Sequence, residues 1–225
     1  MSNSPRGLNR TELSMQENLS LVEEQKISDK IKATKKYGTK IDSKSRTLYN
    51  SNGKPVYKVE VYESQRPKKI QNGKDILGND ITESLIEKTE AIIITPATSL
   101  YDPETISVEA YITAQFAQGT TSEGNVGYRL ISANGGWVNH DNQIISINHS
   151  ATICNTDKNG GGEWNAPVSN ATWSMTNPSS HIVSMIPADW GLCGAKVKCT
   201  IYEAMYPQDR WDFHFKVMKI DSKPY

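Results

Sequence analysis

The stretch TISVEAYITAQF, residues 105–116, decides the fold class. Its apolar side chains occupy every second position from Ile106 to Phe116, and polar side chains fill most of the positions between them. Successive side chains of a β-strand point to opposite faces of the sheet, so an alternation of this length is typical of a strand with one buried face. The sequence therefore predicts a strand over residues 106–116 that packs on a core.

Strand patterns and turn-forming residues recur along the C-terminal part of the chain. Further strands are predicted at 125–132, 143–153, 171–175, 181–186, 195–205 and 211–219. Several short antiparallel strands with turns between them are typical of sandwiches and jelly rolls. We therefore predict a mainly β protein, with an antiparallel β-sandwich or jelly-roll-like domain over residues 91–225. The apolar run AIII, residues 91–94, is predicted to be a buried strand.

The N-terminal part of the chain predicts a helix and a hairpin appended to this domain. Apolar residues recur at helical intervals between about residue 12 and residue 36, Ser14 and Glu17 have the spacing of a capping box, and Gly38 ends the pattern. The Asn-Gly pair in the turn NSNGK, residues 50–54, predicts a hairpin between strands at 46–49 and 56–62.

A basic linker follows this hairpin, and Thr82 is a suitable cap for a short helix at 82–90. We therefore divide the chain into a tail and amphipathic helix (1–45), a hairpin, linker and short helix (46–90), and the sandwich domain (91–225).

The amino-acid composition limits the kinds of molecule that the protein is expected to bind and the compartment in which it is expected to lie. Lys plus Arg and Asp plus Glu each total 25, so the chain carries no global field that would attract nucleic acid. No apolar run approaches the roughly 20 residues that cross a bilayer, so no transmembrane segment is expected. The first ten residues, MSNSPRGLNR, lack the apolar core of a signal peptide. The texture of the strands, rich in Asn and Thr, is nevertheless typical of extracellular or cell-surface domains, and we predict that location.

Residues 155–163, NTDKNGGGE, resemble half of a calcium-binding loop. Calcium prefers oxygen ligands, and alternating Asn and Asp side chains around a glycine bend present such oxygens. The twelfth position, normally Glu, is Ala166, and the three consecutive glycines are typical of a simple hairpin turn. We favour the turn and retain calcium as the alternative cofactor, with the ligands Asn155, Asp157, Asn159 and Glu163.

Tryptophans supply the candidate binding residues. Several of the five Trp side chains stand in loop-like segments beside Gly, Asn and Asp, as in NGGWVNHDN and GGGEWNAP. An indole ring can stack on a sugar while neighbouring amides bind its hydroxyls, and Trp is also enriched in protein-recognition hot spots. The alternative is that these large side chains belong to the core. The predicted ligand-binding residues are Trp137, Trp164, Trp190, Asn139 and Asp141.

Catalytic and metal-binding motifs are sparse. The four His residues show no zinc-binding spacing, and no nucleophile elbow, phosphate loop or dinucleotide fingerprint occurs. Four acids offer carboxylates of the kind that glycosidases use in pairs, but their spacing selects no pair. These acids are Glu163, Glu203, Asp209 and Asp212.

The three cysteines help to predict the cellular compartment, because disulfides form mainly in extracellular proteins. Alternation in AKVKCTIYEA, residues 195–204, places Cys199 on the inward face as a small core residue. Cys154 ends one predicted strand and Cys193 lies in a turn, so a Cys154–Cys193 disulfide at the rim of the sandwich is predicted. Cys193–Cys199 is the competing pair.

From these patterns we expect a secreted or surface-displayed, non-enzymatic module that binds carbohydrate or protein through loops bearing Trp. A carboxylate-dependent hydrolase is the first alternative. The second is an assembly protein that forms oligomers through its N-terminal helix.

Overall fold

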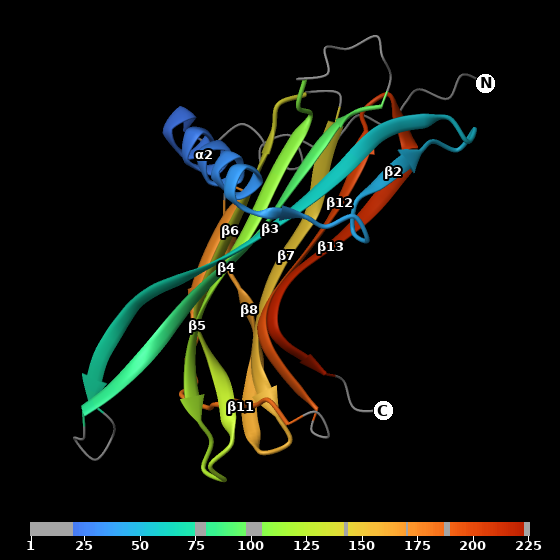
Figure 1. Cartoon of the computed structure of the whole chain (residues 1–225). Coiled ribbons are helices and arrows are strands. Elements are labelled where there is room, and N and C mark those ends of the chain that lie inside the picture. Colours follow the sequence, from blue (N-terminus) through green and yellow to red (C-terminus); the bar gives the residue numbers. More distant parts are fainter. Residues whose placement is uncertain are drawn as a thin grey trace.

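The computed structural model describes residues 20–74, 80–97, 105–141, 144–169, 171–186 and 190–222. Figure 1 shows two antiparallel sheets packed face to face, with one helix lying on the outer side of the larger sheet. The predicted β-sandwich with an N-terminal helix is confirmed.

Nine strands form the larger sheet. In hydrogen-bonded order the path is β1-β3-β4-β5-β6-β10-β9, with β2 paired to β3 and β11 paired to β6. The bounds are β1 (Thr39–Lys40), β2 (Arg46–Tyr49), β3 (Pro55–Lys74), β4 (Asp80–Pro96), β5 (Val108–Thr120), β6 (Val126–Asn139), β9 (Val168–Ser169), β10 (Thr172–Thr176) and β11 (Val183–Ser184).

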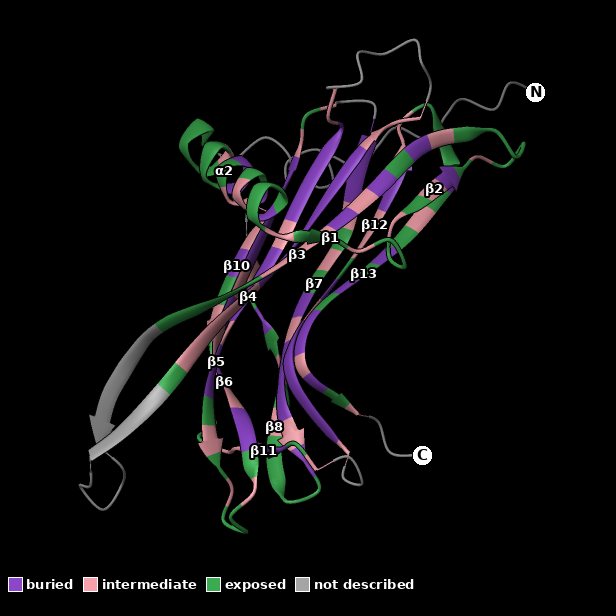
Figure 2. Cartoon of the chain, in the orientation of Figure 1, coloured by how far each residue is buried: buried purple, intermediate pink, exposed green. Residues whose placement is uncertain are grey.

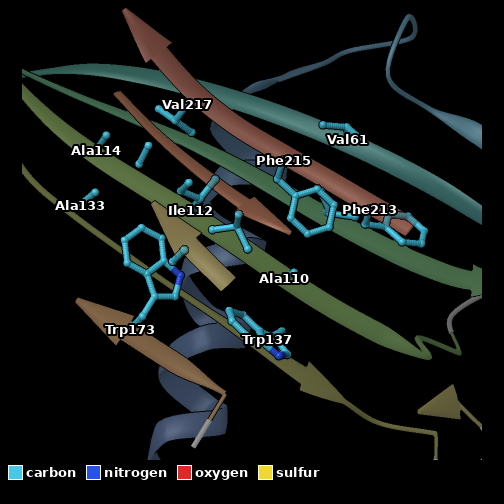
Figure 3. Close-up of a cluster of buried hydrophobic side chains, with 14 of the residues drawn as sticks. Val61, Ala110, Ile112, Ala114, Ala133, Trp137, Trp173, Phe213, Phe215 and Val217 are labelled. Carbon is cyan, nitrogen blue, oxygen red and sulfur yellow. The ribbon is translucent and has the colours of Figure 1, made fainter. Parts of the chain in front are cut away.

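The smaller sheet has the order β13-β12-β7-β8. Its bounds are β7 (Ile144–Asp157), β8 (Gly160–Ala166), β12 (Gly191–Glu203) and β13 (Tyr206–Ser222). Alternate side chains of both sheets face one another and form the main core. Figure 3 shows the Trp137, Trp173, Phe213 and Phe215 rings within this cluster, and Figure 2 shows the buried strands around it.

The predicted inward set of residues 106–116 is confirmed from Val108 to Phe116, since every second side chain of β5 belongs to the main core. The predicted hairpin at 46–62 is also present as β2 and β3, and Gly53 has the positive φ of 73° that its turn requires. Trp173 lies in the core as well, where its ring covers Gly135. A Cβ at that glycine would stand 2.5 Å from the indole nitrogen.

The helix predicted at 82–90 is wrong, because those residues belong to β4. This strand pairs with β3 on one side and with β5 on the other. Lys88 and Glu63 form an ion pair of 3.0 Å across β3 and β4, so the polar side chains that resemble a helix surface are held between neighbouring strands. Residue 90, where composition suggests a boundary, lies inside β4.

Helix α2 (Leu21–Tyr37) packs on the outer face of the larger sheet. Its N-terminus is capped by Ser20 and Glu23, which form both halves of a capping box. The predicted start near residue 12, with Ser14 and Glu17, lies outside the described residues. Ile27 and Ile31 are buried against Ala91 and Ile93, so both faces of the run 91–94 are covered.

β3 extends beyond the strands that cover its outer edge. β2 pairs with β3 at residues 55–59, β1 pairs with it at residues 62–63, and β4 pairs along its whole length. From Ser64 onward β3 therefore pairs on one side only, within the described part of the sheet. Figure 1 shows the β3–β4 hairpin reaching past the body of the sandwich.

Candidate functional site

Trp137 lies inside the sandwich. Its side chain is 5% exposed and belongs to the main core. The indole Nε1–H donates to Nδ1 of His149 over 2.7 Å, and the two rings meet edge to face with centroids 4.1 Å apart. The ring face is therefore covered by protein.

The other predicted ligand-binding residues do not meet at one place. Asn139 Nδ2 donates to the carbonyl of Ile144 at the start of β7, and Asp141 stands two residues after Asn139 in the chain. Trp190 precedes Gly191, which pairs with Asp157 at the far end of β7. The predicted residues are thus divided between the two ends of the sandwich.

Trp164 is half-buried on β8 opposite Ile153, and its side chain packs against the main core. Trp190 is also half-buried. Neither ring therefore offers a fully exposed stacking platform.

The loop at 155–163 is a tight hairpin between β7 and β8. Asn155 is fully buried and links the two sheets. Its Oδ1 accepts the backbone N–H of Leu130 over 2.8 Å, and its Nδ2 donates to the carbonyl of His181 over 2.7 Å. Gly161 adopts a φ of +85°, and a Cβ there would lie 1.9 Å from the Asn155 carbonyl oxygen, so the close turn needs glycine.

Asp157 holds the segment before β11. One carboxylate oxygen accepts from His181 Nε2 and the backbone N–H of Asn159, each over 2.8 Å, and the other accepts from the N–H of Ser184 over 3.1 Å. Burial acts to raise the pKa of Asp157, but these hydrogen bonds outweigh it and lower that pKa.

Glu163 lies on the opposite face of the sheet from Asn155 and Asp157. It pairs with Cys154, and Lys196 approaches its carboxylate at 3.7 Å. Among the described residues, no three His, Cys, Asp or Glu side chains are grouped so that they would hold a metal ion.

The predicted disulfide is wrong, because all three cysteines are free. Cys154 pairs with Gly194 and Cys193 pairs with Asn155, so the two thiols occupy opposite faces of one sheet. Cys193 belongs to the main core, whereas Cys154 packs with Leu192 and Met218 outside it. The competing Cys193–Cys199 bond is absent too. Burial raises the thiol pKa of all three, to about 12 for Cys154 and Cys199.

Sequence patterns do not reveal a partly buried Ser–His pair that lies beside Trp137. Ser146 Oγ lies 2.5 Å from His149 Nε2. Because Trp137 donates to Nδ1, the proton of the neutral ring is on Nε2, and Ser146 accepts it. This is the reverse of a nucleophilic serine activated by a base. Burial lowers the pKa of His149 to about 3, so the ring stays neutral.

A second polar cluster ties the helix to the sheet. Glu109 is 2% exposed on the outer face of β5 and accepts from Ser28 of α2 over 2.5 Å. His140 Nε2 lies 2.9 Å from the same carboxylate. Burial acts to raise the pKa of Glu109, and these two partners outweigh it and lower that pKa.

A cavity of about 330 Å³ opens along one side of the sandwich, and we call it the edge cavity. Its floor comes from β3 and β4, β13 forms the facing wall, and the β1–β2 loop (residues 41–45) lies beside it. Its lining residues are Ser43, Lys44, Ser45, Arg46, Val59, Val61, Glu90, Ile92, Phe213, His214, Phe215 and Lys216.

Exposed aromatic residues gather at the end of the sandwich where the β2–β3 and β12–β13 turns lie together (Figure 1). Trp211 Nε1 donates to the carbonyl of Tyr49 over 3.2 Å, and Asp209 accepts the N–H of Ser51 over 2.8 Å. We call this region the aromatic end surface. It comprises Tyr49, Met205, Tyr206, Arg210 and Trp211.

Within the described residues, no helix is both long enough and apolar enough to cross a bilayer. Comparisons of the chain with protein families, with curated proteins and with solved structures find no match.

Proposed function

We propose that this protein is a non-enzymatic β-sandwich binding module, secreted or displayed at a cell surface, whose ligand is a protein or a carbohydrate. The aromatic end surface carries the proposal. Tyr49 is 56% exposed, Met205 78% and Tyr206 52%, although such side chains are usually turned inward in a monomeric protein.

The composition of this surface favours a protein partner. Tyr, Trp, Met and Arg are enriched in the centres of protein interfaces, and a few such side chains supply most of the binding free energy. The surface offers Tyr49, Tyr206, Met205 and Arg210, and Trp211 is half-buried beside Tyr49. Tyr and Trp rings also stack on sugars, so carbohydrate remains the second ligand class.

The surface is held in place before any ligand arrives. The hydrogen bonds from Trp211 to Tyr49 and from Ser51 to Asp209 join the two turns. The guanidinium of Arg210 lies 5.0 Å from the ring centroid of Tyr202 and donates to the carbonyl of Pro207. Ordering of Trp211 and Arg210 on binding therefore costs little entropy, which favours affinity.

The test uses the full chain on a glycan array and against a displayed protein library, followed by affinity measurement on the ligands found. We expect Tyr49→Ala with Tyr206→Ala to weaken binding by at least about tenfold, since loss of a hot-spot aromatic costs about 2 kcal/mol. Tyr37→Ala is the matched control, because Tyr37 is 65% exposed on α2. If the Tyr49→Ala/Tyr206→Ala variant binds as tightly as Tyr37→Ala and the wild type, the binding site does not lie on the aromatic end surface.

A hydrolase is the second candidate, and one observation favours it. Burial raises the pKa of Glu203, and the negative charges of Asp209 and Asp141 raise it further. A carboxyl whose pKa is raised by burial and by neighbouring carboxylates has the property required of the general acid of a glycosidase. Turnover of nitrophenyl glycosides by the wild type, abolished in Glu203→Gln, would support this candidate. Absence of turnover across the panel would remove it.

A further inference from the structure

We propose that the edge cavity binds a small amphipathic anion, a single carboxylate carried on an apolar body. This site is separate from the aromatic end surface. Its volume of about 330 Å³ lies at the lower end of the roughly 300–1,000 Å³ range of small-molecule pockets.

The deep part of the cavity is apolar. Val59, Val61 and Ile92 project from the larger sheet, and Phe213 and Phe215 face them from β13. Figure 3 shows Val61, Phe213 and Phe215 within the same cluster of buried side chains. An alkyl or aromatic group of a ligand would bury its surface between these walls, at about 25 cal/mol per Å² of apolar area.

Arg46 supplies a carboxylate receptor at the mouth. Its guanidinium carbon lies 4.9 Å from the ring centroid of Phe213, and Nη2 donates to the carbonyl of Asp212 over 3.3 Å. A guanidinium has five N–H donors, and that hydrogen bond occupies one of them among the described residues. A planar cation on an aromatic ring keeps its edge open for a two-point contact with a carboxylate.

The other cations that line the cavity are ion-paired, which leaves Arg46 as the one without a carboxylate partner in the described part of the chain. Glu90 is 2% exposed, is ion-paired with Lys44 and accepts the backbone N–H of Lys216. The ammonium of Lys216 pairs with Asp221, and the carboxylate of Asp212 accepts from Thr200. Arg46 is thus the lining cation without a carboxylate partner among the described residues, and a single negative group on an apolar body would complement it.

The free edge of β13 adds polar contacts beside Arg46. Backbone groups of alternate residues in a strand point to the same side, and Asp212 and Lys216 direct theirs to the cavity, where they meet Arg46 and Glu90. His214 lies midway between them, so its N–H and C=O face the cavity as well. These groups would hold a second polar atom of the ligand.

The test titrates the full chain with octanoate, octan-1-ol and octylamine while amide shifts are followed by NMR. We expect saturable binding of octanoate, with shifts centred on residues 43–46 and 213–216. Octanol should bind at least about tenfold more weakly because it lacks the charge, and octylamine should not saturate. Equal binding of all three probes, or of none, overturns the proposal.

Variants separate the receptor from the apolar walls. Arg46→Gln should weaken octanoate about tenfold and leave octanol unchanged, and Arg46→Lys should fall between them because it keeps the charge and loses the planar fork. Glu90→Gln should strengthen octanoate, since Lys44 is then free to bind it. Arg66→Gln is the matched control, because Arg66 is exposed outside the cavity and its guanidinium also lies over an aromatic ring, that of Tyr37. If the Arg46→Gln variant has the thermal midpoint of the wild type and binds octanoate equally well, Arg46 is not the carboxylate receptor.

Discussion

At the scale of single residues, buried polar side chains in this protein act as links between elements. Asn155 joins the two sheets, Asp157 fixes the segment before β11, and Glu109 fastens the helix. Each satisfies backbone or hydroxyl donors that would otherwise be buried without partners, at a cost of about 1–3 kcal/mol apiece. The residues that resemble ligands in the sequence are therefore committed to the fold.

The partly buried ring of His149 leads to a prediction about how the stability of the fold depends on pH. Burial lowers its folded pKa to about 3 from an ordinary value near 6.5, so the unfolded chain binds the proton more readily. Stability should therefore fall as pH drops below 6.5, by at most about 1.4 kcal/mol per pH unit. Asp157 and Glu109 have lowered pKa values and affect stability only at lower pH, whereas the raised pKa values of Glu90 and Glu203 act in the opposite direction. The contribution of His149 is therefore the difference between the wild type and a His149 variant over the interval from pH 7 to 5.5.

Urea unfolding at pH 7 and at pH 5.5 measures this difference. We expect His149→Gln to reduce the change in unfolding free energy toward zero, since the Gln side chain can still accept from Trp137 but does not titrate. His214→Gln, at an exposed position, should retain the wild-type change. An undiminished change in His149→Gln would assign the proton uptake to another group.

The β7–β8 turn gives a second prediction. The oxygens of Asn155 and Asp157 already accept hydrogen bonds, and Glu163 lies on the other face. We therefore expect the same thermal midpoint in millimolar calcium as in chelator. Asp157→Ala should cost about 2–4 kcal/mol in either buffer, because it leaves two backbone N–H groups and His181 without an acceptor.

Asp42→Ala, at an exposed position in the β1–β2 loop, is the control for that change and should alter stability by less than about 0.5 kcal/mol. A calcium-dependent rise in the midpoint that Asp157→Ala removes would instead establish a metal site.

At the scale of elements, the local sequence pattern predicts where a strand lies better than it predicts which strand or helix that strand contacts. Alternation over residues 106–116 predicts β5 and its inward face, because one side of that strand is uniformly apolar. The same reasoning fails at residues 82–90, where charged side chains are held by ion pairs with β3 and α2, as in Lys30–Glu87 at 2.9 Å. Such contacts join positions far apart in the chain, and a local window does not contain them.

The docking of α2 is open to direct measurement. Ile31 is fully buried against Ala91, Ile93 and Val138, so Ile31→Ala should lower the unfolding free energy by about 2–4 kcal/mol. Leu21→Ala, at a position 83% exposed on the same helix, should change it by less than about 0.5 kcal/mol. Denaturant unfolding followed by circular dichroism provides both values. A small effect of Ile31→Ala would mean that the helix adds little to the stability of the sandwich.

At the scale of the whole molecule, the candidate sites arise from assembly of distant segments. The edge cavity brings Arg46, Glu90 and Phe213 together, and the aromatic end surface joins Tyr49 to Trp211. None of these residues stands in a recognisable motif, and their types alone are common. Trp137 and its neighbours do resemble a binding loop in sequence, yet burial of an apolar ring in the core is the stronger effect.

We predict that residues 46–225 fold as one unit, because β3, β4 and β5 are neighbours in one continuous sheet. A chain of residues 91–225 keeps only the last part of β4 and loses β3, so the outer edge of β4 and the face covered by α2 become exposed. We expect this chain to show no cooperative thermal transition, whereas the full chain shows one. A sharp transition in the shorter chain would establish residues 91–225 as an independent domain.

The one-sided stretch of β3 bears on solubility. An unpaired strand edge is a template on which a second copy can add its own strand, and proteins that remain dispersed block such edges with charge or proline. β3 has Arg66, Pro67 and Lys68 in succession where its outer partners end. Proline has no N–H to offer an incoming strand, and the cations on either side repel an identical edge. The reach of the hairpin is thus compatible with a chain that does not aggregate through this exposed edge of β3.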